Sequence, residues 1–188
     1  VDGLPTGVVR LGPWRRGGGE FGVTVESARS PADTWSVDVA AGKAIRWTES
    51  ETGGMVAAQL PEAEAIRWPS FDGREISGFL YRPPARFTGP RPVVIVIHGG
   101  PEGQSRPVFL GRNNFLLDEL GVALVYPNVR GSSGFGKTFL KLDNGMERMA
   151  SVRDISALLD WIAERKDLDA RRVMVTGGSY GGFMTLAV

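Results

Sequence analysis

The stretch Val173-Met174-Val175-Thr176-Gly177-Gly178-Ser179-Tyr180-Gly181-Gly182 decides the fold. It starts as an apolar strand candidate and then places Ser179 between Gly177 and Gly181, the G-x-S-x-G spacing of a nucleophile elbow. In such an elbow the serine sits in a strained turn between strand and helix, and residues without Cβ at the flanking positions let the two elements close around it. The following residues 183–187 are compatible with a helix, so we predict Ser179 as a nucleophile; the alternative is an ordinary flexible loop.

Two backbone amides are candidates for stabilising an oxyanion. The elbow leaves the amide of Tyr180 free at a helix N-terminus. His98-Gly99-Gly100-Pro101 directly follows the apolar run 93–97, and the loop after this strand supplies the second donor in an α/β-hydrolase. We assign that donor to the amide of Gly100. His98 precedes the elbow, so we expect it to shape the loop by hydrogen bonding, with general base as the alternative.

The residues around these motifs alternate between strand and helix patterns. Apolar runs at 93–97, 122–126 and 173–176 are typical of strands buried in a parallel sheet. Between the last two, residues 151–165 place Ile155, Leu158, Leu159 and Ile162 on one helical face, and a further helix is expected at 113–120. A hairpin signal at 71–74 precedes a strand at 75–81. The order predicts a doubly wound α/β sheet, the N-terminal part of an α/β-hydrolase.

The first part of the chain has a different pattern. Short alternating stretches at 22–27, 34–39 and 43–48 are separated by turn residues and indicate antiparallel strands. Strands this short are not stable alone, so we expect a larger β structure, such as one propeller blade. The alternative is a β-extension packed on the next domain. We place the partial propeller at residues 1–60 and the catalytic domain at residues 61–188.

Composition excludes several classes of function. The 188 residues are 42% hydrophobic and 23% charged, as in a globular protein, and the net charge of +1 gives no footprint for nucleic acid. With no cysteine and a single histidine, we expect no metal site and no cofactor. The longest aliphatic run, Val93 to Ile97, is far too short to cross a membrane. We expect a cytoplasmic protein without a membrane or nucleic-acid partner, although the lack of cysteine does not by itself fix the compartment.

A rival motif lies at Gly131 to Thr138. Gly131-Ser132-Ser133-Gly134-Phe135-Gly136-Lys137-Thr138 satisfies the G-x-x-x-x-G-K-[ST] pattern of a phosphate-binding loop. Residues 127–130 separate it from the preceding strand, and a turn at 143–145 interrupts the helix whose N-terminus would hold phosphate. We therefore keep nucleotide binding only as an alternative.

Three motifs together resemble one family. His98-Gly99-Gly100-Pro101, the stretch from Asn128-Val129-Arg130-Gly131 to Gly136, and Gly177 to Gly182 are similar to the prolyl oligopeptidase family of serine peptidases, in its acylaminoacyl-peptidase and dipeptidyl-peptidase-like branch. The resemblance covers residues 65–188, and the β-rich start resembles the end of the propeller that precedes the catalytic domain there. It implies hydrolysis of short peptides through an acyl-enzyme on Ser179, with the 128–136 stretch as a loop beside the active site.

In that fold the acid and the histidine of the triad follow the serine in chain order, so we expect both beyond Val188. We read the chain as an internal piece of a longer protein, inactive by itself, whose parent is a candidate homo-oligomer. A carboxylesterase of the same fold would use the same Ser179, and a non-enzymatic binding domain that keeps the elbow is a further alternative.

Overall fold

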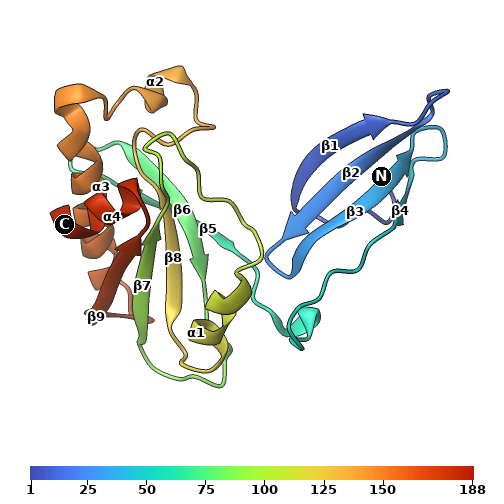
Figure 1. Ribbon diagram of the computed structural model, residues 1–188. Helices are drawn as coiled ribbons and strands as arrows, with labels where there is room; N and C mark the ends of the chain where they lie inside the picture. Colours follow the sequence, from blue (N-terminus) through green and yellow to red (C-terminus); the bar gives the residue numbers. More distant parts are fainter. The chain divides into compact units, whose positions relative to one another are not determined.

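The computed structural model describes residues 1–188, which form two compact units with one sheet each (Figure 1). The first unit comprises residues 1–62 with 107–114, and the second comprises residues 63–106 with 115–188. The strand order is β1-β2-β3-β4 in the first sheet and β5-β6-β8-β7-β9 in the second.

The first sheet is an antiparallel meander. Its strands are β1 (Val8–Trp14), β2 (Glu20–Ser27), β3 (Ser30–Asp38) and β4 (Lys43–Arg46), with Val23, Val25 and Val37 as its buried core. The three strands expected here are confirmed, but β1 was not predicted. It is an exposed edge strand that contains Pro13, and its register shifts between Leu11 and Trp14. Proline normally argues against a strand, so the sequence pattern of β1 did not indicate one, but proline is tolerated at edges and bulges such as this.

The second sheet is mixed. An antiparallel hairpin of β5 (Glu64–Pro69) and β6 (Glu75–Tyr81) follows a short 3-10 helix at Ala57–Gln59. Strand β6 then pairs antiparallel with β8 (Ala123–Asn128), whereas β7 (Arg91–Ile97) pairs parallel with both β8 and β9 (Leu168–Gly177). The carboxyl ends of β7, β8 and β9 therefore meet at one edge of the sheet.

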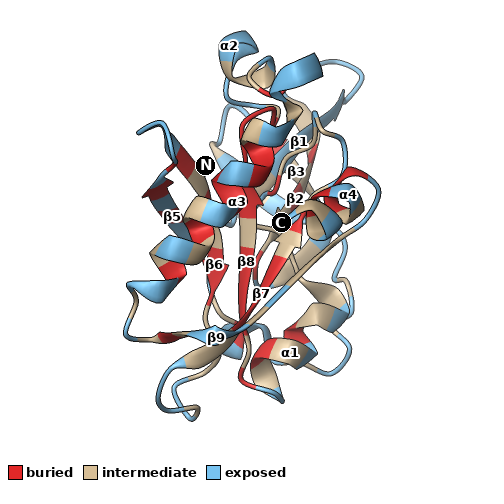
Figure 2. Ribbon diagram, turned by 90° about the vertical axis from the view of Figure 1, so that its left-hand side faces the viewer, coloured by how far each residue is buried: buried red, intermediate tan, exposed pale blue.

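Helices cover both faces of this sheet, as expected for a doubly wound fold. The chain moves from β7 to β8 through α1 (Asn114–Asp118) and then back past β7 to β9 through α3 (Arg148–Ala163). Because parallel crossovers are right-handed, this reversal puts α1 and α3 on opposite faces. Helix α3, with α4 (Tyr180–Ala187), buries the main apolar core, and Figure 2 shows α3 lying over the strands.

The helical boundaries differ slightly from the expected ones. The helix expected at 113–120 is a 3-10 turn at Gly111–Asn113 followed by the five residues of α1, and the helix expected at 151–165 begins earlier, at Arg148. Two more short helices, α2 (Lys137–Leu140) and a 3-10 turn at Gly145–Glu147, lie between β8 and α3. None of the helices is long and apolar enough to cross a membrane.

Candidate active site

Ser179 occupies a sharp bend between β9 and α4. Its φ of 55° and ψ of −118° make it the only non-glycine residue in the chain with positive φ. Such a conformation is unfavourable for a residue with Cβ and persists only where the surroundings impose it. The residue is exposed, although Tyr180 and Gly181 directly after it are buried. The bend therefore presents the serine to solvent at the carboxyl edge of the sheet.

The flanking glycines are required by the packing of the elbow on β7. A Cβ added to Gly181 would lie 2.2 Å from the carbonyl oxygen of Ile97, and one added to Gly177 would lie 2.6 Å from the same oxygen. At Gly178, by contrast, an added Cβ would meet nothing within 4 Å. Two of the glycines are thus steric necessities, because the start of α4 and the end of β9 both lie against the end of β7.

The loop after β7 lies beside this bend. A Cβ added to Gly99 would lie 3.7 Å from the Cβ of Ser179 and 3.5 Å from the carbonyl oxygen of Gly178. Gly100 follows with φ of 142°, a conformation that favours glycine. On the other side, Tyr180 is the first residue of α4, so its amide is among those that no carbonyl within the helix can accept. The loops carrying both predicted oxyanion donors therefore lie at the same edge of the sheet.

His98 is held by hydrogen bonds on both ring nitrogens. Nδ1 lies 2.8 Å from the carbonyl oxygen of Gly99, and Nε2 lies 2.8 Å from the hydroxyl of Ser132. A carbonyl only accepts, so Nδ1 carries the proton and, in the neutral ring, Nε2 accepts from Ser132. This arrangement fits a residue that shapes the loop, with neither nitrogen left over for a proton transfer.

The segment from Gly131 to Thr138 does not form a phosphate cradle. The amides of Gly131, Ser132 and Ser133 donate to the carbonyl oxygens of Phe139, Val129 and Gly103. Phosphate loops need such amides free, at the start of a sustained helix. Helix α2 is only four residues long. The sequence match therefore lacks the geometry on which nucleotide binding depends.

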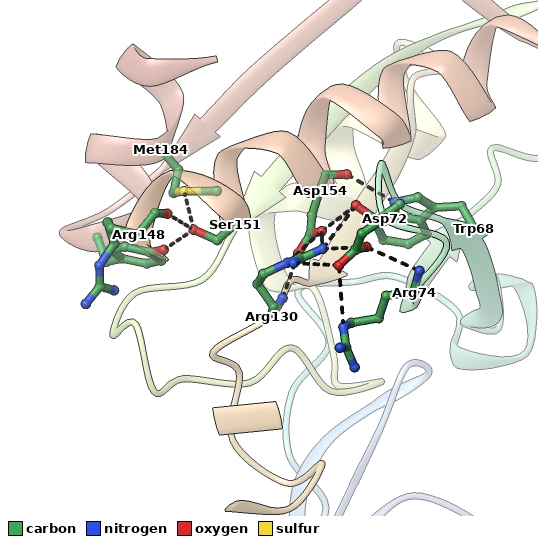
Figure 3. A network of polar contacts seen from close by, with 10 residues as sticks. Trp68, Asp72, Arg74, Arg130, Arg148, Ser151, Asp154 and Met184 are labelled. Carbon is green, nitrogen blue, oxygen red and sulfur yellow. Dashed lines mark hydrogen bonds and ion pairs between the residues drawn. The ribbon is translucent and has the colours of Figure 1, made fainter. Parts of the chain in front are cut away.

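Arg130, which precedes this segment, is the centre of a buried ionic network that the sequence did not reveal (Figure 3). Its guanidinium donates to Asp154 at 2.8 Å and to Asp72 at 3.1 Å, and its own amide donates to Asp154 at 2.9 Å. Asp154 is fully buried and also accepts from the hydroxyl of Ser70 at 2.6 Å. The network fixes the loop after β8 to α3 and to the β5–β6 hairpin.

The opposite charges of this network stabilise one another. Burial opposes the charged form of Arg130, but the hydrogen bonds to Asp154 and Asp72 outweigh burial and raise the pKa of Arg130 above its ordinary value. The same Arg130 hydrogen bond holds the pKa of Asp72 below its ordinary value. In the sequence, Asp72 was read only as part of a hairpin turn, because its partner lies 58 positions away along the chain.

The side chain of Tyr180 is anchored beneath the elbow. Its phenol lies 2.7 Å from the hydroxyl of Ser151 and donates to Asp143 at 3.1 Å. Asp143 is fully buried and also accepts from Arg148 at 2.8 Å. Burial is the main cause that raises the pKa of Tyr180. The residue whose amide is a predicted oxyanion donor is therefore fixed at both its backbone and its side chain.

Comparisons with known proteins find similarity to one family. Residues 108–188 match the model of the prolyl oligopeptidase family. An uncharacterized peptidase of Bacillus subtilis, YuxL, is 36% identical over 129 residues, which cover 65% of this chain and 19% of the relative. Acylamino-acid-releasing enzyme 1 of Oryza sativa is 37% identical over 95 residues, covering 50% of this chain and 12% of the relative.

Solved structures show the same fold. A puromycin hydrolase has a TM-score of 0.80 at 25% identity, covering 90% of this chain and 26% of its own. An acylaminoacyl peptidase of Pyrococcus horikoshii has a TM-score of 0.72 at 26% identity, covering 90% of this chain and 27% of its own. The chain thus spans about a fifth or less of these curated relatives and about a quarter of these structures. Its elbow, its sheet and these matches together lead to one conclusion: residues 108–188 match the prolyl oligopeptidase family.

Proposed function

We propose that this chain carries the nucleophile and the oxyanion hole of a serine peptidase that hydrolyses peptide bonds of short peptides. The observation that carries the proposal is the exposed Ser179 at positive φ, on a bend that packing of Gly177 and Gly181 against β7 imposes. A strained, exposed serine at a strand-to-helix turn is the arrangement by which an α/β-hydrolase presents its nucleophile for acyl transfer.

In the proposed reaction, the Ser179 hydroxyl oxygen attacks the peptide carbonyl and its proton passes to a histidine base. The amides of Tyr180 and Gly100 donate to the oxyanion that forms. The intermediate collapses by breaking the C–N bond, and the histidine returns the proton to the leaving amine. Water then attacks the acyl-enzyme as the same base takes its proton, and the C–O bond to Ser179 breaks as the base returns this proton to the serine oxygen, which releases the acid and the free serine.

The remaining parts of the site are proposed to come from a longer polypeptide. In this fold the triad acid and histidine follow the serine in the chain, so we place both after Val188. The four-stranded sheet β1–β4 has the size of a propeller blade, and we propose that residues 1–60 are the end of a propeller that limits access to small peptides. No cofactor or metal takes part in this proposal.

The test is labelling of the full-length protein with a fluorophosphonate, with Ser179→Ala as its control. We expect the wild type to react at Ser179, the variant to be unlabelled, and the isolated 188-residue segment to react poorly because it lacks the base. Equal labelling of the Ser179→Ala protein would overturn the assignment. A peptide anilide and a matched simple ester then separate the proposal from the esterase alternative, since turnover of the ester alone would favour the latter.

A further inference from the structure

We propose that Ser132 is a positioning residue for the oxyanion hole, acting through His98 on the backbone of Gly99 and Gly100. This inference rests on the proposed function of Ser179 and adds a residue to it. The steps run from a buried hydroxyl to an imidazole, from the imidazole to a carbonyl, and from that carbonyl to the next amide along the chain.

The hydrogen bonds have a fixed direction. The carbonyl of Gly99 can only accept, so the His98 Nδ1 proton points to it, over 2.8 Å. Nε2 of the neutral ring then has no proton and accepts from the Ser132 hydroxyl, also over 2.8 Å. A histidine with a donor on one side and an acceptor on the other has one tautomer and one ring orientation. The Gly99 carbonyl therefore fixes the tautomer of His98, and the hydrogen bond to Ser132 fixes the ring orientation that holds this carbonyl.

Gly99 is the point where this orientation matters. It lies directly against the elbow, as the 3.7 Å from its added Cβ to the Ser179 Cβ shows. Its carbonyl belongs to the same peptide group as the amide of Gly100, so fixing one fixes the direction in which the other points. Glycine itself gives no conformational restraint at either position. The hydrogen bond from His98 restrains this peptide group.

Other contacts between the two loops involve the backbone of Gly103 and Ser105. The amide of Ser133 donates to Gly103 at 2.8 Å, and the side chain of Asn128 accepts from the Ser105 amide at 2.7 Å and donates to the Ser105 carbonyl at 3.1 Å. These bonds hold residues 103–105, and Gly103 packs beside the Gly99 carbonyl, since an added Cβ there would lie 2.1 Å from that oxygen. The contact between Ser132 and His98 is the side-chain hydrogen bond through which the loop after β8 acts on His98.

Ser132 has a rigid base from which to act. It is fully buried, and its amide donates to Val129 at 3.0 Å. Arg130 fixes the loop to Asp154 and Asp72, and Gly131 packs so closely on Asp143 that an added Cβ would lie 2.2 Å from the carboxylate. Because Ser132 is held in this way, the hydrogen bond from its hydroxyl to His98 has a fixed direction, which a mobile surface serine would not provide.

The experiment compares Ser132→Ala with Ser133→Ala in the full-length protein. Both changes remove one hydroxyl from adjacent residues, but Ser133 contacts the other loop through its backbone amide only. The probe is a fluorophosphonate, and the binding and phosphonylation steps are measured separately. We expect phosphonylation of Ser132→Ala to slow about tenfold with binding unchanged, because complete loss of one oxyanion donor costs about 10²–10³ and a displaced donor retains part of its effect. Ser133→Ala should stay within about twofold.

A double variant distinguishes positioning from a general loss of structure. If Ser132 acts through His98, adding Ser132→Ala to His98→Ala slows phosphonylation no further. Additive losses, or equal rates in Ser132→Ala and Ser133→Ala, would overturn the inference while Ser179 labelling still supports the proposed function. Should Ser132→Ala not fold, Ser132→Cys keeps the side-chain volume with a weaker donor and is expected to show the same slowing; an unaltered rate there would also overturn it. Loss of the proposed function itself would appear as labelling that survives Ser179→Ala.

Discussion

Two glycine-rich loops leave the carboxyl edge of the second sheet, and each carries a serine in an opposite environment. Ser179, after β9, is exposed at positive φ, whereas Ser132, after β8, is fully buried and hydrogen-bonded to His98. The glycines of the first loop make room for close packing on β7, and Gly131 in the second makes room for a buried carboxylate. Two loops of similar composition therefore have different roles: one exposes its serine to solvent, and the other holds its serine in the interior.

The largest expected effect on stability concerns the loop after β8, which contains Arg130 and Ser132. Arg130→Ala leaves the fully buried Asp154 without its guanidinium partner, and removal of one member of a buried pair costs about 3–5 kcal/mol. Arg74→Ala is the matched control, because Arg74 is exposed and lies 3.9 Å from the same Asp72. Its effect should stay below about 1 kcal/mol. Urea unfolding of both variants measures the difference, and similar losses would contradict a special role for Arg130.

In the loop after β9, which carries Ser179, stability should depend on side-chain volume at one glycine and not at another. Gly181→Ala places a methyl group 2.2 Å from the Ile97 carbonyl oxygen, and overpacking of this kind costs about 1–3 kcal/mol. Gly178→Ala meets nothing within 4 Å, so we expect a change of about 0.5 kcal/mol or less. The measurement is the unfolding free energy together with fluorophosphonate labelling. If Gly178→Ala were the more damaging change, the packing explanation of the elbow would be wrong.

These two comparisons also show what the sequence could predict. The elbow was readable because its residues are contiguous: an apolar strand, the spaced glycines and a helix-compatible run identify Ser179 without other information. The strands of the sheet were readable for the same reason, since their apolar runs are local. Strand β1 was missed because Gly12 and Pro13 break its alternation, and only its pairing with β2 makes it a strand.

The contacts of the loop after β8 could not be predicted from the sequence, because the partners of its residues are distant along the chain. Arg130 finds Asp72 from the hairpin and Asp154 from α3, and Ser132 finds His98 from the loop after β7. No local sequence pattern predicts such pairs. Residues 131–138 of the same loop also match the sequence pattern of a phosphate-binding loop. The available signal was the stretch Asn128-Val129-Arg130-Gly131 after a buried-type strand, and the family resemblance implied only that it forms a loop beside the site.

A smaller effect is expected where the elbow is anchored from below. Tyr180→Phe removes the phenolic hydroxyl that contacts Ser151 and Asp143. We expect the free energy of unfolding to fall by about 1–2 kcal/mol, because buried acceptors lose a donor. The pKa of Tyr180 is raised mainly by burial, so its contribution to stability is present below the ordinary tyrosine pKa of about 10 and is lost as pH rises through the folded value. The variant should lack this alkaline decline. Unfolding curves from neutral to alkaline pH provide the check, and an unchanged decline would assign it to another group.

The smallest effect separates the two carboxylates that Arg130 contacts. The Arg130 hydrogen bond lowers the pKa of the partly exposed Asp72, so its contribution to stability is present above the unfolded pKa of about 4 and is lost as pH falls through the lower folded value. Asp72→Asn removes this titration but leaves Asp154 to hold the guanidinium. We therefore expect the variant to lose less stability than the wild type on acidification below about pH 4, and to be less stable at neutral pH by a similarly small amount, below about 1 kcal/mol. Parallel acid slopes in the two proteins would mean that Asp72 is an exposed bystander and that Asp154 alone anchors the loop.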